Sequence, residues 1–398
     1  MFLEQGPAEP LAITKALMDQ IDHIRGIQIE IMPITNVNKV PFADQRYTEH
    51  WKIYTFFGGP SLSKAISEKR VEYVPICVSE IPAALRGLYC PDVALIQVTG
   101  PDNSGFYNFG LAADYKRTVV EAATTVIAQV NNKMPVTCGD TGVHLSDIDY
   151  IMEEDTELIQ ISPTKPREME KEIASYVADL VPDESVIQIG IGSVPDAILT
   201  ALLDKHDLGI HSGLLSDRML DLIEVGVVTG KFKNLNPGKV VGTLLIGTER
   251  LYKFCDHNPL IELYPVTYTH NRSIVNQLDN FVSINSAIEV DLTGQVNSET
   301  INGEQLAGIG GQVDFARIAR LSKGGISIIA IPSIANGKTK IVPKLAEVSA
   351  TRTDADYVIT EYGIAHLRYR SLRERAKALM QIAHPDFRKD LSYWGQKV

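Results

Sequence analysis

Basic residues are scarce in this 398-residue chain, which has 38 Lys and Arg against 49 Asp and Glu and a formal net charge of −11. The basic residues that are present are not gathered into runs. Binding to nucleic acid or to an anionic membrane surface needs clustered positive charge. The composition therefore argues against both of these partners and favours a small-molecule ligand.

Cysteine is also sparse, because only four are scattered along the chain, without a Cys-x-x-Cys pair or histidines at zinc spacing. This pattern predicts neither a disulfide framework nor a metal site. The first residues lack the basic region and apolar stretch of an export signal, and no run of about 18 apolar residues occurs. We therefore expect a cytoplasmic protein without a membrane-spanning segment.

Three common catalytic motifs are missing as well. The chain has no GxxxxGK[ST] loop for nucleotide phosphates, no GxSxG turn for a nucleophilic serine and no HExxH zinc helix. Their absence argues against a P-loop kinase, a serine hydrolase of the α/β type and a zinc protease.

A weak internal repeat is the most informative feature that is present. Residues 10–19 return in similar form at 195–204, and a glycine precedes each copy, Gly6 in the first and Gly192 in the second. In both copies an apolar run leads into the glycine, and apolar residues then recur at helical spacing. Each copy therefore predicts a strand, a glycine loop and a helix, which is the opening of an α/β unit.

The rest of the chain alternates between strand-like and helical segments. Strands are predicted at 93–98, 125–130, 240–246, 281–284, 327–331 and 357–360, and helices at 61–68, 219–225, 315–321 and 372–382. This alternation predicts an α/β fold with two open, largely parallel-sheet domains of related topology. Two prolines at 163 and 166 disfavour helix and indicate a linker. We therefore expect an N-terminal domain at 1–162 and a C-terminal domain at 167–398.

Two glycine-rich segments are candidates for ligand binding. Gly190, Ile191 and Gly192 lie between a predicted strand and a helix, where free N–H groups can hold an anion or a polarised carbonyl. Pro195 stands where a dinucleotide-binding loop needs its third glycine, which argues against a nicotinamide cofactor. A simple packing turn remains an alternative.

The second glycine-rich segment spans 301–315. Its Gly303, Gly308, Gly310 and Gly311 precede a predicted helix, and the flanking residues are apolar. Closely spaced glycines let backbone amides approach a ligand. We interpret this segment as a ligand-facing loop, with a flexible surface loop as the alternative.

Two further segments carry polar groups but favour structural roles. Glu289 and Asp291 fall on one face of a predicted strand, where they could act as an acid/base pair or form the polar face of an edge strand. The segment 211–218 precedes a helix, and Ser216 or Asp217 is a candidate N-cap.

Taken together, these segments resemble the acetyl-CoA hydrolase and transferase family, which includes 4-hydroxybutyrate and butyrate:acetate CoA-transferases. The resemblance covers nearly the whole chain and is carried by residues 188–197, 283–297, 308–315, 360–363 and 372–376. It implies two α/β domains, an acyl-CoA site in the cleft between them and a homodimer or larger assembly. It also implies an acyl-CoA and a small carboxylate as partners, with the CoA thioester as substrate and no permanently bound cofactor.

In this family a loop glutamate attacks the thioester and forms an acyl-glutamyl anhydride, then a glutamyl-CoA thioester. Backbone N–H groups hold the developing oxyanion. Carried over, the resemblance assigns oxyanion and acyl-CoA binding to Gly190, Ile191, Gly192, Gly308, Ile309, Gly310 and Gly311.

The chain departs from the family at the nucleophile. The family pattern is His-(Ser/Thr)-Glu-Met-Leu-Ser-Asp-Gly, and here Gly213 stands at the glutamate and Arg218 at the last glycine. Glycine carries no nucleophile, so ordinary transfer needs another group. Arg218 could bind a substrate carboxylate or pair with an aspartate on the same helix.

Several explanations for Gly213 stay open, and one of them is a different reaction on the same scaffold. Ser212 or Asp217 could replace the nucleophile. Alternatively, His211 or Glu361 could activate water for hydrolysis, with Gly213 leaving space for that water. The chain could also be a catalytically silent acyl-CoA-binding protein, or Gly213 could be a substitution introduced to trap an acyl-CoA complex.

Overall fold

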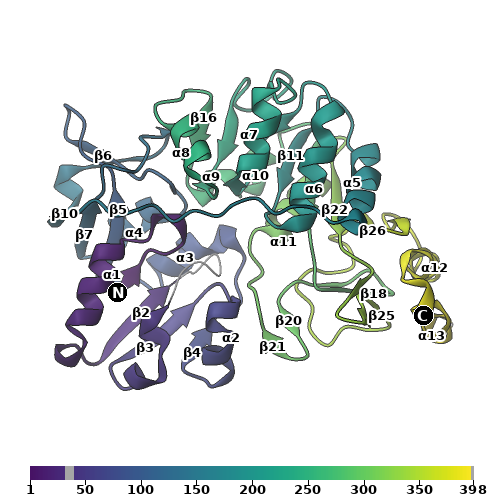
Figure 1. Ribbon diagram of the computed structural model, residues 1–398, viewed down its shortest axis with the longest axis horizontal. Helices are drawn as coiled ribbons and strands as arrows, with labels where there is room; N and C mark the ends of the chain where they lie inside the picture. The colour runs from purple at the N-terminus through teal and green to yellow at the C-terminus, as the bar shows by residue number, and fades with distance from the viewer. Residues whose placement is uncertain (32–39, 396–398) are drawn as a thin grey trace. The chain divides into compact units, whose positions relative to one another are not determined.

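A computed structural model describes residues 1–31 and 40–395. Within these residues the chain forms two compact units, and each contains one predominantly parallel sheet. Unit 1 consists of Met1–Ser162, Val241–Thr269 and Glu304–Gly310, and unit 2 consists of Pro163–Val240, His270–Gly303 and Gly311–Val398. The predicted α/β class with two open, largely parallel sheets is confirmed (Figure 1).

Unit 1 is built on a seven-stranded parallel sheet with the order β10-β7-β5-β1-β2-β3-β4. Its strands are β1 (Phe2–Leu3), β2 (Ile27–Ile31), β3 (Trp51–Thr55), β4 (Val71–Tyr73), β5 (Val93–Val98), β7 (Thr125–Val130) and β10 (Tyr150–Glu153). The helices are α1 (Leu11–Asp19), α2 (Pro60–Ser67), α3 (Ile81–Arg86), α4 (Lys116–Ala122), α8 (Glu249–Cys255) and α9 (Val266–Thr269). Shorter strands are β6 (Phe106–Asn108), β8 (Cys138–Gly139), β9 (Gly142–His144), β15 (Leu244–Leu245), β16 (Ile261–Leu263) and β21 (Glu304–Gln305).

Unit 2 is built on a six-stranded sheet with the order β12-β11-β17-β22-β26-β27, in which only the edge strand β27 is antiparallel. Its strands are β11 (Val186–Ile189), β12 (Gly209–Ile210), β17 (Phe281–Asn285), β22 (Ile326–Ala330), β26 (Tyr357–Thr360) and β27 (Gly363–His366). The helices are α5 (Glu168–Leu180), α6 (Ser193–Ala201), α7 (Asp217–Glu224), α10 (Arg272–Val275), α11 (Gln312–Leu321), α12 (Leu372–Ile382) and α13 (Arg388–Gly395). Shorter strands are β13 (Leu214–Leu215), β18 (Glu289–Asp291), β19 (Val296–Asn297), β20 (Thr300–Ile301), β23 (Ile334–Ala335), β24 (Lys338–Thr339) and β25 (Ile341–Val342), and β14 (Val240–Gly242) lies where the chain passes between the units.

Both copies of the sequence repeat form the same local structure. The strands β1 and β11 each lead through a glycine with positive φ into a helix, with φ +80° at Gly6 before α1 and φ +123° at Gly192 before α6. A left-handed backbone favours glycine at such a turn because glycine has no Cβ. The two units therefore begin with matching strand, turn and helix segments.

One predicted strand differs from the structure. The segment 240–246 forms the two short strands β14 and β15 instead of one continuous strand, with a bend at Thr243. The hydroxyl of Thr243 donates to the carbonyl oxygen of Tyr264 at 2.7 Å, and its own carbonyl accepts from the Ala113 amide at 2.8 Å. These hydrogen bonds hold the bend, which apolar patterning alone did not predict.

The crossovers in unit 2 place helices on both faces of its sheet. The connection from β11 through α6 leads to β12 on one side, whereas the connection from β17 through α11 leads to β22 on the other side. Because parallel crossovers are right-handed, connections that run in opposite directions place their helices on opposite faces. Helix α6 packs against α5 and α7, and α11 packs against β17 and β22 (Figure 1).

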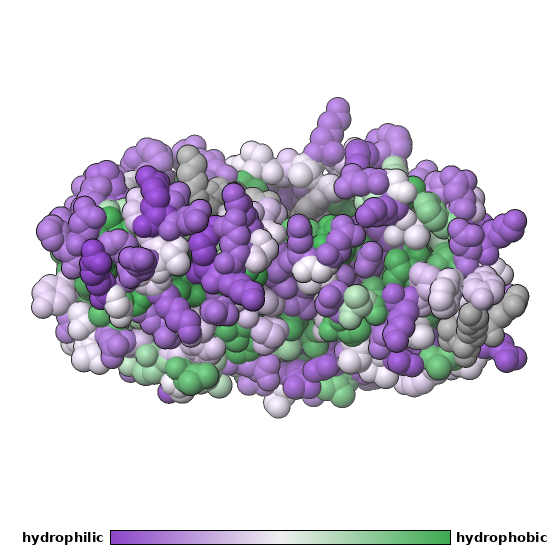
Figure 2. Space-filling view, turned by 90° about the horizontal axis from the view of Figure 1, so that it is seen from below, coloured by the Kyte–Doolittle hydropathy of each residue, from purple (hydrophilic) through white to green (hydrophobic). Residues whose placement is uncertain are grey.

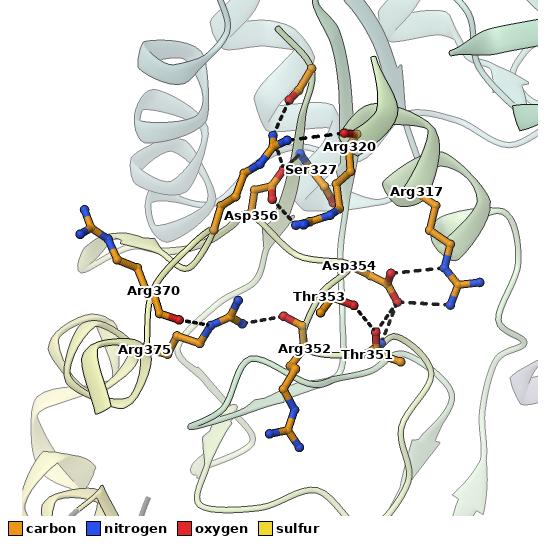
Figure 3. Close-up of polar contacts among 12 residues, drawn as sticks. Arg317, Arg320, Ser327, Thr351, Arg352, Thr353, Asp354, Asp356, Arg370 and Arg375 are labelled. Carbon is orange, nitrogen blue, oxygen red and sulfur yellow. Dashed lines mark hydrogen bonds and ion pairs between the residues drawn. The ribbon is translucent and has the colours of Figure 1, made fainter. Parts of the chain in front are cut away.

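A cluster of arginines and aspartates fastens α11 to the strand β26 (Figure 3). Arg320 of α11 and Arg368 both pair with the buried carboxylate of Asp356. Arg317 of α11 pairs with Asp354 at 3.2 Å. These contacts fix the helix whose first turn follows Gly311.

One face of the described residues is drawn in Figure 2 with its side chains coloured by hydropathy. Hydrophilic side chains cover much of the face in Figure 2, and apolar side chains lie between them. No helix in the described part of the chain has the length and apolar character needed to cross a membrane.

Two leucines that differ in burial test whether α6 packs into the core of unit 2. Leu199 of α6 is buried, whereas Leu203, one turn later, is 38% exposed. We expect Leu199→Ala to lower the free energy of unfolding by about 2–5 kcal/mol, because it removes buried methyl groups and leaves a cavity. Leu203→Ala should change it by less than about 1 kcal/mol. Urea unfolding followed by circular dichroism measures both, and equal losses would contradict this packing.

Candidate active site at the carboxyl edge of the unit 2 sheet

The parallel strands of unit 2 all end at one edge of the sheet, and the predicted site residues of this unit cluster after those ends. In open α/β sheets, ligands bind at the carboxyl ends of the strands. The segments at this edge are 190–192 after β11, 211–213 after β12, Ser286 after β17, 332–336 after β22 and Glu361 after β26.

A cavity of about 380 Å³ lies beside the first glycine loop. It is lined by Ile191, Gly192 and the first turn of α6, together with Ser286, Pro332, residues 334–336, Arg167 and Lys340. The amides at the start of a helix favour a negatively charged or polarised group. The cavity therefore combines amide donors with two basic side chains.

The two basic side chains of this cavity differ in their surroundings: Arg167 forms an ion pair, and Lys340 is largely buried. Arg167 is paired with Glu170 at 2.6 Å. Burial lowers the pKa of Lys340, and the charge of Glu289 acts in the opposite direction. The other carboxylate of the predicted pair, Asp291, accepts hydrogen bonds from Thr293 and from the Gln295 side chain at 2.8 Å. Asp291 therefore shapes the turn that follows β18, which is a structural role.

Polar side chains on β11 and β17 form hydrogen bonds next to the loops that follow these strands. The hydroxyl of Ser283 donates to Gln188 at 2.8 Å, and the Asn285 amide donates to Ser283 at 2.9 Å. The next residue, Ser286, donates to the carbonyl oxygen of Ala330 at 3.0 Å and so ties the end of β17 to the end of β22.

His270 packs against two of the predicted site glycines. A Cβ built on Gly213 would lie 3.1 Å from the His270 Nε2 atom, and one built on Gly311 would lie only 2.7 Å from the same atom. The ring of Phe315 contacts the same two positions, because its Cε2 atom would lie 3.3 Å from a Cβ on Gly213 and 3.1 Å from one on Gly311, and its centroid lies 4.4 Å from that of His270. Gly213, Gly311, His270 and Phe315 therefore form one packed group, which we call the His270 cluster.

The His270 imidazole is neutral in this environment. His270 is only 3% exposed, and burial lowers its pKa to about 3. Removing an imidazolium from water is costly, so an apolar surrounding favours the neutral ring. The next residue, Asn271, caps α10 by accepting a hydrogen bond from the Ser273 amide at 3.0 Å, which fixes the backbone beside His270.

The other predicted residues near the glutamate position occupy defined structural places. His211 is fully buried, and its amide donates to the carbonyl oxygen of Ile187 at 3.2 Å. The hydroxyl of Ser212 donates to the carbonyl oxygen of Ile189 at 3.3 Å, which holds the segment 211–213 beside the end of β11. Arg218 pairs with Asp221 at 3.1 Å, as the helical spacing predicts.

Glu361 is held by one serine. Its two carboxylate oxygens accept hydrogen bonds from the Ser333 amide at 2.8 Å and from the Ser333 hydroxyl at 2.5 Å. This arrangement ties the end of β26 to the loop after β22. Glu361 thereby supports one wall of the cavity.

The second glycine loop belongs partly to unit 1. A Cβ on Gly308 would lie 3.0 Å from the carbonyl oxygen of Phe56, and the carbonyl of Gly310 accepts from the Val78 amide at 3.4 Å. The chain enters unit 2 at Gly311. Because Ile309 and its neighbours lie in unit 1 and residues 190–192 lie in unit 2, the convergence of both loops on one thioester stays a prediction.

Sequence reasoning missed His270. It stands in the segment Tyr268-Thr269-His270-Asn271, which matches no catalytic motif. A histidine at an unpatterned position gives no signal of its own, and only the fold brings it to Gly213 and Gly311.

The tight packing in the His270 cluster predicts different costs for two glycine substitutions. Gly311→Ala should lower the free energy of unfolding by about 1–3 kcal/mol because the new methyl group would press on the imidazole. Gly213→Ala should cost less because its contacts are longer. Urea unfolding measures both, and His270→Ala should relieve the cost of Gly311→Ala. An unchanged cost in that background would contradict the contact.

The lowered pKa of His270 predicts a pH dependence of stability. An unfolded histidine binds a proton below its usual pKa of about 6.5, whereas folded His270 stays neutral down to about pH 3. The stabilisation is therefore complete above pH 6.5 and is lost as the pH falls toward 3. Between pH 7.5 and 5.5 the wild type should lose about 1.4 kcal/mol more than His270→Gln in urea unfolding. Equal losses in both proteins would contradict the neutral buried ring.

Two family models and several known proteins match this chain. The N-terminal domain model of acetyl-CoA hydrolase/transferase matches residues 1–163, and the C-terminal domain model matches residues 247–393. The chain is 44% identical over 389 residues to 4-hydroxybutyrate coenzyme A transferase of Clostridium kluyveri, covering 96% of this chain and 90% of that protein. It is 39% identical over 399 residues to the succinyl-CoA:acetate/propanoyl-CoA:succinate CoA transferase of Fasciola hepatica, covering 98% of this chain and 83% of that protein.

A solved structure shows the same fold. The crystal structure of RipA from Yersinia pestis superposes with a TM-score of 0.94 at 34% identity and covers 100% of this chain and 93% of RipA. With both domain models matched and relatives aligned over nearly its full length, the chain belongs to the acetyl-CoA hydrolase/transferase family.

Proposed function

We propose that this protein moves CoA between a small acyl-CoA and a carboxylate. The observation that carries the proposal is the carboxyl edge of the unit 2 sheet, where a glycine loop, a helix start and a cavity with basic side chains lie together. Membership of a family of CoA-transferases and acetyl-CoA hydrolases supports it. The function implies an acyl-CoA and a small carboxylate as partners, and CoA as substrate instead of a permanently bound cofactor.

Backbone amides are the groups that this proposal assigns to the thioester carbonyl. Attack on a thioester turns the carbonyl oxygen into an oxyanion, which preorganised N–H donors stabilise. Ile191 and Gly192 line the cavity and follow Gly190, so this loop offers such donors. The family resemblance assigns a second set of donors to residues 308–311. Arg167 and Lys340 supply positive charge for the anionic parts of CoA or for the acceptor carboxylate.

Direct hydrolysis of the acyl-CoA is the second candidate function. Gly213 carries no side chain that could hold CoA as a covalent thioester, and this favours a route in which water accepts the acyl group. Glu361, a candidate for activating that water, already accepts two hydrogen bonds from Ser333. Transfer and hydrolysis differ in one product, so a single assay separates them.

The assay incubates the protein with acetyl-CoA or butyryl-CoA and a labelled carboxylate. Transfer places the label in the CoA ester, whereas hydrolysis releases free CoA without labelling it. We expect label in the ester, measured by chromatography and mass spectrometry. Binding of CoA by calorimetry without either product would contradict the transferase proposal and indicate a binding protein.

A further inference from the structure

Lys340 differs from two other basic residues near the carboxyl edge of the unit 2 sheet, because no acidic side chain lies at ion-pair distance from it. Arg167 pairs with Glu170 at 2.6 Å, and Arg218 pairs with Asp221 at 3.1 Å. Within the described part of the chain, the Lys340 side chain takes part in no hydrogen bond or ion pair. The cavity is therefore lined by one cation whose charge no contact neutralises.

The backbone of Lys340 is fixed between two segments of the candidate site. Its amide donates to the carbonyl oxygen of Ser333 at 2.9 Å, and its carbonyl oxygen accepts from the Val290 amide at 2.9 Å. Ser333 in turn holds Glu361 at the end of β26. The Lys340 side chain thus starts from a defined position in the wall of the cavity.

The cavity that Lys340 lines also contains the first glycine loop. Ile191 and Gly192 line it as well. A Cβ built on Gly190 would meet no atom within 4 Å, so there is open space beside this loop. Lys340 and the amide donors of the loop therefore border the same accessible space.

We propose that Lys340 binds the carboxylate of the free acid, which accepts CoA in one direction of the reaction and is released in the other. This inference rests on the proposed function and deepens it, because it assigns a binding residue to one of the two substrates. The ammonium group donates a charge-assisted hydrogen bond to a carboxylate oxygen. No bond to Lys340 forms or breaks during the transfer.

The position of Lys340 favours this carboxylate over the phosphates of CoA. In an acyl-CoA the thioester and the phosphates stand at opposite ends of the pantetheine arm. The amides assigned to the thioester line the same cavity of about 380 Å³ as Lys340, so a group that Lys340 binds there lies near the thioester end.

The charges around the cavity also suit a single carboxylate. Arg167 is balanced by Glu170, and the charge of Glu289 acts on Lys340 from beyond ion-pair distance. The phosphates of CoA carry several negative charges, for which this nearly balanced set offers little compensation. One carboxylate needs only the positive charge of Lys340.

Partial burial makes Lys340 a better partner for an anion. Burial lowers the pKa of Lys340, because its ammonium group is less well hydrated than in water. A bound carboxylate supplies the missing opposite charge where the attraction is screened less than in bulk water. The chain has a net charge of −11, so overall attraction does not gather carboxylates and a local cation is needed.

The first test measures the transfer kinetics of Lys340→Met. We expect KM for the carboxylate to rise roughly tenfold to a hundredfold, as for the loss of a hydrogen bond between charged groups, while KM for acyl-CoA changes less than about threefold. Lys340→Arg keeps the charge and should recover most of the loss. Circular dichroism confirms that each variant is folded.

Lys338→Met is the matched control. Lys338 lies two positions earlier, is exposed, does not line the cavity and donates to Asn302 at 3.4 Å. Its substitution removes the same charge and should leave both KM values at their wild-type levels. An equal rise of KM for the carboxylate in Lys338→Met and Lys340→Met would overturn the inference, because it would reflect only the net charge.

Two further results would place Lys340 at CoA instead of at the carboxylate. One is a raised KM for acyl-CoA with an unchanged KM for the carboxylate. The other is a difference between esters of CoA and dephospho-CoA that the wild type shows and Lys340→Met has lost. Either result would overturn the inference. Any release of free CoA by water should continue at the wild-type rate in Lys340→Met, since water carries no charge.

Direct binding gives a readout that needs no turnover. Ligand-observed NMR of the wild type with CoA present should show binding of butyrate and much weaker binding of butyramide, which has a similar shape but no charge. Lys340→Met should lose this preference, and Lys338→Met should keep it. Equal binding of butyrate and butyramide by the wild type would contradict a carboxylate site at Lys340.

This inference and the proposed function fail in different ways. An unchanged KM for the carboxylate in Lys340→Met would overturn the role of Lys340 and leave the transferase function standing. A wild type that transfers CoA to no tested carboxylate would overturn the proposed function. The comparison of butyrate with butyramide would then still decide whether Lys340 binds a carboxylate.

Discussion

The contact between the His270 imidazole and the two glycines depends on the absence of side chains at both positions. Three segments that are distant in sequence meet here: the residue before β13, the residue after α9 and the residue before α11. A Cβ on Gly311 would come within 2.7 Å of Nε2, so an imidazole and a side chain at position 311 cannot both fit without movement. The side chains that fit at positions 213, 270 and 311 therefore depend on one another. A larger residue at one position needs a smaller one, or movement, at another.

The parallel sheet of unit 2 makes this meeting possible. Its strands from β12 to β26 deliver their following loops to a single edge, and the crossover helices α6 and α11 start at that edge. The pairs that join α11 to Asp354 and Asp356 hold the far end of the helix, so its first turn keeps a fixed position. The position of the first turn of α11 thus depends on polar contacts about two turns further along the helix.

Much of the fold could be predicted from the sequence because it follows local patterns. The strands at 93–98, 125–130 and 357–360 and the helix at 372–382 have the predicted bounds, since apolar runs and capping residues mark them. The glycine turn before α6 was also predicted from its place between a strand and a helix. The break at Thr243 was not, because it depends on hydrogen bonds to Ala113 and Tyr264.

The candidate site was predictable only in part, and for a similar reason. The glycine loops and the vacant nucleophile position were visible in the sequence and in the family pattern. His270 was not predicted as a site residue. Only the fold brings it into contact with Gly213, which is 57 positions earlier in the chain. Glu361 and Asp291 were reasonable carboxylate candidates, but partners such as Ser333 and Thr293 give each of them a structural task.

A crystal structure with a stable, non-cleavable acyl-CoA analogue would test the account most directly. The measured quantity is the distance from the backbone nitrogens of Ile191 and Gly192 to the oxygen that corresponds to the thioester carbonyl oxygen. The account predicts that this oxygen lies about 2.7–3.1 Å from at least one of these nitrogens, the distance at which a backbone donor stabilises an oxyanion. An analogue whose carbonyl oxygen lies beyond hydrogen-bond distance of the amides of residues 190–192 would contradict it.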